Sequence, residues 1–295
     1  MNITASLVKE LRDKTGAGMM DCKKALQECD GDVGKSVDWL REKGIAKAAK
    51  RAGKIAAEGL TRVLVDGNQA VLVEINSETD FVAKNNLFIK LLDDTTKAIL
   101  VNQPKDLAAA EALVVDGKSI SEAIVDTIAT IGEKISLRRF IIVEKADADC
   151  FGSYMHMHGT ISALAVIKNS SDAVVAKDMA MQVASMNPQF ISQSHMDTAF
   201  IEHEKSIQLE IIKNDESLAN KPEKVIDGIV KGRLSKSLQD ISLVDQVYFK
   251  DQDKKVSQFL KENNTEVVNF VRYAVGEGIE KREDNFAEEV LNTSF

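Results

Sequence analysis

The sequence predicts an α+β protein that combines several helical segments with small antiparallel sheets. Apolar residues recur at helical spacing along residues 3–43. Residues 66–68, Asp-Gly-Asn, stand between two runs rich in β-branched residues, which is a strong signal for a β-hairpin. Strand-like composition returns in residues 136–144, after a stretch of helical periodicity. Helices and strands therefore occupy separate blocks, as in the α+β class.

The N-terminal block, residues 1–43, is predicted to be a compact module of three short helices. Glycines and aspartates interrupt it in residues 15–18 and 30–32, where glycine allows a left-handed backbone and aspartate can cap the next helix. Residues 44–59 are rich in alanine, lysine and glycine and have almost no large apolar side chain. Such a segment can bury little surface. We interpret residues 44–59 as a linker, with a helical linker as an open alternative.

The core is predicted to contain two α+β subdomains. The first comprises residues 60–147, and the second comprises residues 148–195 and 239–280. In both, a hairpin precedes a helix, so a structural duplication is a hypothesis that rests on element order alone. The expected strands are residues 60–66, 70–76, 136–144, 151–157, 160–168 and 266–275, and the expected helices are residues 80–100, 121–134 and 172–186.

Residues 196–238 are predicted to be an inserted helical hairpin. Two polar helical patterns flank residues 214–223, where Asn220-Lys221-Pro222 acts as a breaker. Each arm has a narrow apolar stripe, which suits an antiparallel coiled coil. Residues 281–295 are expected to form a C-terminal helical segment. The stripes consist of Phe200, Ile207, Ile211 and Leu218 on one arm and Ile226, Val230, Leu234 and Leu238 on the other.

The charge and the apolar pattern narrow the functional classes. A formal net charge of -8 argues against a dedicated nucleic-acid binder, because phosphate contacts need a basic field. No apolar run approaches the length that spans a bilayer, and the N-terminus lacks a basic flank followed by an apolar block. We therefore expect a cytoplasmic protein with a protein partner or small ligands, no direct nucleic acid and no membrane.

The cysteines and histidines give little sign of catalysis or metal binding. Cys22, Cys29 and Cys150 are odd in number and fit no CxxC pattern, which indicates reduced thiols. The sequence has no Gly-rich phosphate loop and no GxSxG motif, so we predict that the protein is not an enzyme and needs no cofactor. His156-Met157-His158 is the best metal candidate, but alternate residues of a strand face opposite sides. His195 and His203 are interpreted as solvated.

Residues 78–85 have two interpretations. They follow a predicted strand and precede a predicted helix, so Thr79 or Asp80 can be a helix N-cap. In that case Phe81 packs onto the sheet. This structural interpretation is favoured by the local sequence, because caps are common and exposed phenyl rings are not. A functional interpretation needs information from the rest of the chain.

Four motifs together span nearly the whole chain. They are TGAGMMDCKKAL at residues 15–26, TDFVAKN at 79–85, GSYMH at 152–156 and FVRYAVGEGIEK at 270–281. In these motifs and their order the sequence resembles the bacterial translation elongation factor Ts (EF-Ts) family. Two departures from the family pattern matter: residues 157–160, Met-His-Gly-Thr, replace a Gly-rich stretch followed by arginine, and Val247 stands where proline is common.

The resemblance implies a fold and a function. The fold is a ubiquitin-associated-like (UBA-like) three-helix module, a linker, a core of two α+β subdomains with an inserted antiparallel coiled coil, and a C-terminal segment. The function is guanine-nucleotide exchange on elongation factor Tu (EF-Tu) in translation elongation. The factor binds EF-Tu in its GDP-bound and nucleotide-free states, perturbs the magnesium and phosphate site, and promotes GDP release so that GTP can bind.

The resemblance also implies which residues contact the partner. Residues matching the motif that dislocates magnesium are Thr79, Asp80, Phe81 and Val82. A rigid phenyl ring can wedge between partner helices, and a carboxylate can disturb the network that retains magnesium. The other implied contacts are Arg12, Met19, Met20, Lys23 and His156.

Simpler roles remain open for some of these residues. His156 can be a strand histidine with a local hydrogen bond, and Met19 or Met20 can belong to the core of the module. Two other functions are also open. One is a generic helical adaptor, in which the N-terminal module binds ubiquitin-like or other partners. The other is a metal-dependent enzyme built around His156, His158 and Cys150.

Overall fold

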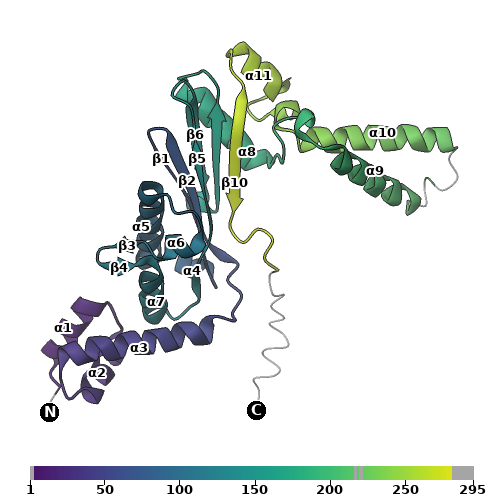
Figure 1. The fold of residues 1–295 in the computed structure, drawn as a ribbon. Helices are drawn as coiled ribbons and strands as arrows, with labels where there is room; N and C mark the ends of the chain where they lie inside the picture. Colours follow the sequence, from purple (N-terminus) through teal and green to yellow (C-terminus); the bar gives the residue numbers. More distant parts are fainter. Residues whose placement is uncertain (1–2, 216–217, 219–221, 281–295) are drawn as a thin grey trace.

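The structure is a computed structural model that describes residues 3–215, 218 and 222–280. Within these residues, helices combine with small antiparallel sheets, so the α+β prediction is confirmed. Three N-terminal helices lie at one end of the molecule, two three-stranded sheets lie in the middle, and a pair of helices projects at the other end (Figure 1). The predicted segment 281–295 lies outside the described residues, as does most of the predicted breaker at 220–222.

The N-terminal module is built from three helices that share a small core. The predicted breaks are confirmed: the first helix ends at Gly16, whose φ is 69°, and the Asp32 side chain caps the third by accepting a hydrogen bond from the Lys35 N–H. The buried residues are Val8, Leu11, Cys22, Ala25 and Leu26. The helices are α1 (Ala5–Thr15), α2 (Met19–Glu28) and α3 (Val33–Arg51).

The third helix continues beyond the module, so the open alternative of a helical linker is confirmed for residues 44–51. Because α3 continues to Arg51, the boundary placed after residue 43 falls inside a helix. The expectation that residues 44–59 bury little is wrong at Gly44, which is buried against α7 (Ile120–Ile131). A Cβ added at Gly44 would lie 3.0 Å from the Cβ of Ala129. Small residues give α3 its contact, because they let two helix backbones approach closely.

The first sheet contains β1 (Glu58–Asp66), β2 (Gln69–Ser77) and β5 (Ile135–Glu144), in the antiparallel order β1-β2-β5. The predicted hairpin is confirmed, since Asp66 pairs with Gln69 across a two-residue turn. Strand β2 is buried on both faces, with alternate residues directed to opposite sides. Its residues Val71, Val73 and Ile75 face a layer of helices, and Ala70 and Leu72 face the second sheet.

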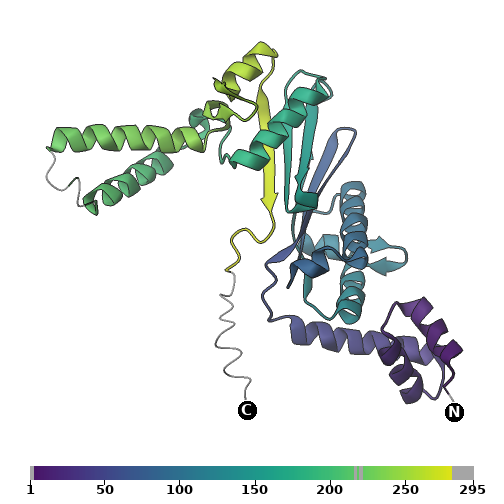
Figure 2. The same cartoon turned by 180° about the vertical axis from the view of Figure 1, so that it is seen from behind.

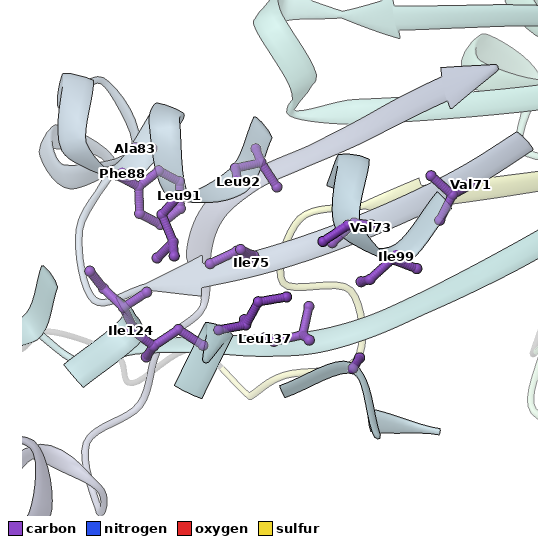
Figure 3. Packing of buried hydrophobic residues seen from close by; sticks show 14 of the residues in the cluster. Val71, Val73, Ile75, Ala83, Phe88, Leu91, Leu92, Ile99, Ile124 and Leu137 are labelled. Carbon is purple, nitrogen blue, oxygen red and sulfur yellow. The ribbon is translucent and has the colours of Figure 1, made fainter. Parts of the chain in front are cut away.

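A layer of helices covers one face of the first sheet. In the core between these helices and the sheet, Phe88, Leu91 and Leu92 share an apolar cluster with Val73 and Ile75 of β2 (Figure 3). Two elements were not predicted: a helix of five residues at Leu107–Glu111, and a hairpin whose strands, Val114–Val115 and Lys118–Ser119, have two residues each. Such short elements have no measurable periodicity. The elements are α4 (Asp80–Ala83), α5 (Asn86–Asn102), α6 (Leu107–Glu111), β3 (Val114–Val115), β4 (Lys118–Ser119) and α7.

The second sheet has the antiparallel order β10-β7-β6 and is covered on one face by α8 (Ala173–Met186). Gly152 allows this contact, because a Cβ there would lie 1.8 Å from the carbonyl oxygen of Ala176. Its strands follow the prediction closely; the short elements after the inserted hairpin were not predicted. The elements are β6 (Cys150–His156), η1 (Met157–Gly159), β7 (Ile161–Ile167), β10 (Val267–Ala274), η2 (Gln193–His195), η3 (Leu243–Asp245), β8 (Val247–Tyr248), β9 (Asp251–Lys255) and α11 (Val256–Glu262).

The two sheets pack against each other. Val63 and Leu72 of the first sheet share an apolar cluster with Leu164 of the second. At one edge of this contact the Thr61 hydroxyl donates a hydrogen bond to the carbonyl oxygen of Gly159 at 2.7 Å. Gly159 has a φ of 110°, and a Cβ there would lie 2.4 Å from the Thr61 carbonyl oxygen. Glycine is therefore required where the turn after β6 meets β1.

A buried carboxylate ties the first sheet to the chain that follows β10. The carboxylate of Glu74 is fully buried on β2 and accepts hydrogen bonds from Arg138 at 2.9 Å, Arg139 at 2.6 Å and the Gly276 N–H at 2.9 Å. Burial acts to raise the pKa of Glu74, but these hydrogen bonds and the charge of Arg139 outweigh it, so the pKa is lowered. Glu74 is therefore ionised at neutral pH and joins segments far apart in the sequence.

The projecting pair consists of α9 (Thr198–Lys213) and α10 (Glu223–Asp240), which lie side by side (Figure 1). The stripe predicted on α10 is confirmed, with Val230 and Leu238 buried. On α9 the prediction is wrong: Ile212 is buried, whereas Ile207 and Ile211 are exposed. Adjacent isoleucines at 211 and 212 offer two helix faces about 100° apart, and periodicity alone could not choose between them.

Candidate partner-binding site

The site begins where β2 ends. We call residues 77–85 the tip, which leaves the sheet at Ser77, forms the single turn α4 and ends at Asn85, the N-cap of α5. The side chain of Phe81 is 79% exposed at this turn. The prediction that Phe81 packs onto the sheet is wrong, and the core against β2 contains Phe88 of α5 instead (Figure 3).

Thr79 occupies the predicted N-cap position but does not cap α4 with its side chain. Its hydroxyl donates instead to Glu133 Oε1 at 2.8 Å, and its N–H donates to Glu133 Oε2 at 2.9 Å. The Ser77 hydroxyl donates to the Thr79 carbonyl oxygen at 2.9 Å. The base of the tip is therefore held by polar contacts to the loop after α7.

Asp80 is an exposed carboxylate beside a cation. Lys84 Nζ lies 2.7 Å from Asp80 Oδ2 and 5.8 Å from the centre of the Phe81 ring. The hydrogen bond from Lys84 lowers the pKa of Asp80, which keeps this side chain charged at neutral pH. The tip thus presents a negative charge, a cation and an aromatic ring within one helical turn.

Val82 differs from Phe81 because its side chain faces inward. It is 5% exposed and belongs, with Ala83, to the core beneath α5. The same helical turn therefore directs Phe81 to solvent and Val82 to the core. Burial of Val82 fixes the rotation of α4, which sets the direction of Phe81.

The other predicted contact residues near the N-terminus are all on the surface. Arg12 lies on α1, and Met19, Met20 and Lys23 lie on α2. Met19 is 60% exposed and Met20 is 76% exposed, so the alternative that either one packs in the core is wrong. Two adjacent exposed methionines at a helix start form an adaptable apolar surface.

His156 is the last residue of β6, and its side chain is exposed. Its Nδ1 lies 3.2 Å from the Tyr154 hydroxyl, so the predicted local hydrogen bond is present. The strand was predicted to continue through Met157, but Met157 and His158 have φ values of 45° and 60° and form a turn. The alternation expected for His156 and His158 therefore does not apply.

The residues suggested for a metal-dependent enzyme do not converge. Cys150 and His156 lie at opposite ends of β6. The two residues are six steps apart along the strand, which corresponds to roughly 20 Å, since a strand rises about 3.3 Å per residue. Within the described chain, no group of three or more His, Cys, Asp or Glu side chains is arranged to hold a metal ion.

The predicted contact residues fall into three separate groups. Thr79 to Val82 lie on and before α4, the four N-terminal residues lie at the far end of α3, and His156 lies at the end of β6. Figure 2 shows the N-terminal helices well away from α4 in the reverse view as well. A partner that touched all three groups would need an extended surface.

Two residues at the site were missed from the sequence. Glu78 and Glu133 bind the two loops that meet at the base of the tip. Periodicity carries no sign of them, because both lie in loops and act on residues more than fifty positions away. The one local signal was Gly132, a left-handed residue with a φ of 88° that ends α7 and places Glu133.

Comparison with models of protein families gives one further finding. The family described as Elongation factor TS matches residues 78–277. The matched range starts within the tip and includes the helical layer, the second sheet and the projecting pair. Among the helices of the described residues, none has both the length and the apolar character needed to cross a membrane.

Proposed function

The chain belongs to the elongation factor Ts family, and from this premise we propose that it is a guanine-nucleotide exchange factor for EF-Tu. Members of this family take part in translation elongation as partners of EF-Tu and are not catalytic enzymes. In our proposal the chain binds EF-Tu in the GDP-bound and nucleotide-free states. It needs no cofactor, nucleic acid or membrane, and it acts in the cytoplasm.

The single observation that carries the proposal is the exposed ring of Phe81. A phenyl side chain that is 79% exposed contributes little to folding, but it can bury a large apolar area against another protein. Val82 and the bonds to Glu133 hold the base of α4, so the ring is presented from a fixed support. A fixed ring can displace partner side chains with little loss of conformational entropy.

The chemistry of exchange requires displacement and no covalent step. GDP is held in a GTPase by backbone N–H groups, a lysine and a magnesium ion in the phosphate loop. We propose that Phe81 wedges between partner helices and that Asp80 disturbs the ligands that retain magnesium. Loss of the magnesium ion weakens the hold on the diphosphate, and GDP leaves.

Linkage sets a condition on this mechanism. The factor can weaken GDP binding only if it binds nucleotide-free EF-Tu more tightly than GDP-bound EF-Tu. GDP must then weaken the factor by the same ratio, and GTP binding reverses the complex in the same way. The tip must therefore contact regions of EF-Tu that differ between these states.

The remaining contacts provide affinity. We propose that the N-terminal helices are a UBA-like module that grips EF-Tu through Arg12, Met19, Met20 and Lys23. We further propose that α9 and α10 act as an antiparallel coiled coil and that His156 contacts the region near the phosphate loop. The domain boundaries are proposed as predicted, except where an element crosses one: α3 crosses the boundary after residue 43, β1 the one after residue 59 and α10 the one after residue 238. An interface of this kind is large, which suits a stable complex.

Release of a fluorescent GDP analogue from EF-Tu, followed with and without the protein, tests the proposal. We expect the wild-type chain to accelerate release. Phe81→Ala should reduce the acceleration by roughly 30-fold, which corresponds to about 2 kcal/mol of lost interaction. The matched control is Val101→Ala on α5, because Val101 is 77% exposed but lies outside the tip.

Two results would contradict the proposal. If the wild-type chain bound EF-Tu without accelerating release, the helical adaptor interpretation would replace exchange. If Phe81→Ala and Val101→Ala were equally active, the tip would have no role in exchange.

A further inference from the structure

Two glutamates hold the base of the tip, and each accepts hydrogen bonds from the loop that contains the other. Glu133, in the loop after α7, accepts the N–H and the hydroxyl of Thr79 at 2.9 and 2.8 Å. Glu78, beside Thr79, accepts the N–H of Lys134 at 2.7 Å. Each loop thus supplies a carboxylate to the backbone of the other. We call Glu78 and Glu133, with these three hydrogen bonds, the carboxylate clamp.

The clamp supplies what α4 lacks. A helix of one turn is unstable in isolation, because helix nucleation is unfavourable. In addition, α4 has no side-chain cap, since the Thr79 hydroxyl is directed to Glu133. Two hydrogen bonds from Thr79 to one carboxylate fix both the position and the orientation of that residue. The clamp therefore determines where α4 begins, and together with the burial of Val82 it sets the direction in which Phe81 projects.

The clamp is also connected to α3. Arg51, at the end of that helix, lies 3.2 Å from Glu78 Oε2. Lys134 Nζ donates to the carbonyl oxygens of Ala52 and Lys54, both at 2.8 Å. The charge of Arg51 thus offsets that of the Glu78 carboxylate. The base of the tip is thus bonded to the end of α3 as well as to the loop after α7.

We propose that Glu133 is a positioning residue for nucleotide exchange, acting through Thr79 to hold Phe81 in its active direction. This inference rests on the proposed exchange function. Affinity for EF-Tu comes mainly from the other contact groups, whereas the tip acts on the nucleotide site. Loss of Glu133 therefore lowers the exchange rate at saturating factor and leaves the half-saturating concentration nearly unchanged.

Amide hydrogen exchange on the isolated protein tests the structural half without EF-Tu. In Glu133→Ala, amide exchange of residues 78–83 should accelerate at least about tenfold, because the loss of a charge-assisted hydrogen bond corresponds to such a factor. Protection of β1 and β2 should stay as in the wild type. Glu133→Gln keeps one oxygen acceptor for the Thr79 N–H, so its amide exchange rate at residues 78–83 should lie between the rates of the wild type and of Glu133→Ala. Unchanged exchange at residues 78–83, or loss of protection throughout β2, would overturn the inference.

Release of a fluorescent GDP analogue from EF-Tu tests the functional half. Glu133→Ala should lower the saturating rate about tenfold, the factor expected for one lost charge-assisted hydrogen bond, and Glu133→Gln should restore part of it. The half-saturating concentration should change less than about twofold, well below that factor. The matched control is Glu111→Gln on α6, because the side chain of Glu111 makes no hydrogen bond or ion pair with any of the described residues.

The outcomes separate the two proposals. A wild-type saturating rate in Glu133→Ala would overturn the positioning role even if exchange activity itself is found. A rise in half-saturating concentration with an unchanged saturating rate would also overturn it, since Glu133 would then serve affinity. If wild-type protein failed to accelerate GDP release, the proposed function would fail, and the positioning role would be overturned with it, although the amide exchange result would still decide whether the clamp orders the tip.

Discussion

Two phenylalanines seven positions apart have opposite surroundings. Phe81 on α4 is 79% exposed, whereas Phe88 on α5 is fully buried over β2 (Figure 3). The tip is held mainly at its base, by the bonds to Glu133 and by Val82, and α5 is held along its length by apolar packing. The difference shows that one segment separates two tasks. Helix α5 stabilises the sheet, and α4 presents a ring that the fold does not use.

Replacing Phe88 should have the largest effect on stability. Phe88→Ala removes a buried ring and leaves a cavity, so the free energy of unfolding should fall by about 3–5 kcal/mol. Chemical denaturation followed by circular dichroism measures this change. Phe88→Leu keeps most of the volume and should be less destabilising. A loss below about 1 kcal/mol would mean that α5 does not anchor the sheet, and the contrast with α4 would disappear.

Glu74→Gln extends the comparison from aromatic rings to carboxylates. Glu74 is buried between Arg138 and Arg139, whereas Asp80 is exposed beside Lys84. Removing one partner of a buried ion pair leaves charge without compensation, so Glu74→Gln should cost about 3 kcal/mol at pH 7. Asp80→Asn should change the free energy of unfolding by less than about 0.5 kcal/mol. Equal changes in the free energy of unfolding for the two substitutions would show that Glu74 does not tie the first sheet to the chain that follows β10.

The ionised carboxylate of Glu74 also predicts that the free energy of unfolding depends on pH. The folded-state pKa of Glu74 lies below its ordinary value of 4.5, so its contribution is complete above that value and is lost as the pH falls through the folded-state pKa. The wild-type protein should therefore lose stability in acid more steeply than Glu74→Gln. Denaturation curves between pH 3 and pH 7 measure the difference. Parallel losses in the two proteins would contradict the ionised, paired state of Glu74.

Much of the fold follows from local sequence. The two-residue turn after Asp66, the breaks before α2 and α3, and the apolar stripe on α10 are encoded by neighbouring residues. Glycine, aspartate and periodic apolar side chains act over a few positions, so sequence reasoning can detect them. Where neighbouring residues alone determined the local backbone conformation, the prediction matched the structure.

The rest depends on contacts between distant residues. Glu74 binds the Gly276 N–H across 202 positions, and Glu133 binds Thr79 across 54. No local pattern encodes such pairs. The contact of α3 with α7 was missed because it uses small residues such as Gly44, which carry no hydrophobic signal. The exposure of Phe81 could not be derived either, since the orientation of α4 depends on the burial of Val82 and on the bonds of Thr79 to the distant Glu133.

Gly44→Val tests whether α3 is fixed to α7 as the tip is fixed at its base. A side chain at position 44 meets the Cβ of Ala129, so it should separate the helices and cost about 1–2 kcal/mol. Gly228→Val on the exposed face of α10 is the matched control, because a Cβ there meets nothing within 4 Å, so it reports the helix propensity of a glycine-to-valine change alone. Equal effects of the two substitutions would mean that α3 gains no stability from α7.

Phe81→Ala should have the smallest effect on stability and therefore tests the comparison most directly. Phe81 is 79% exposed and its ring lies 5.8 Å from Lys84 Nζ, so the free energy of unfolding should change by less than about 0.5 kcal/mol. Stimulated GDP release should nevertheless fall in the same preparation. A loss of stability above 1 kcal/mol, roughly that of a packed side chain, would show that the ring packs on its own fold. The fall in exchange could then reflect a disordered tip, and Phe81 would no longer be distinguished from Phe88 by its task.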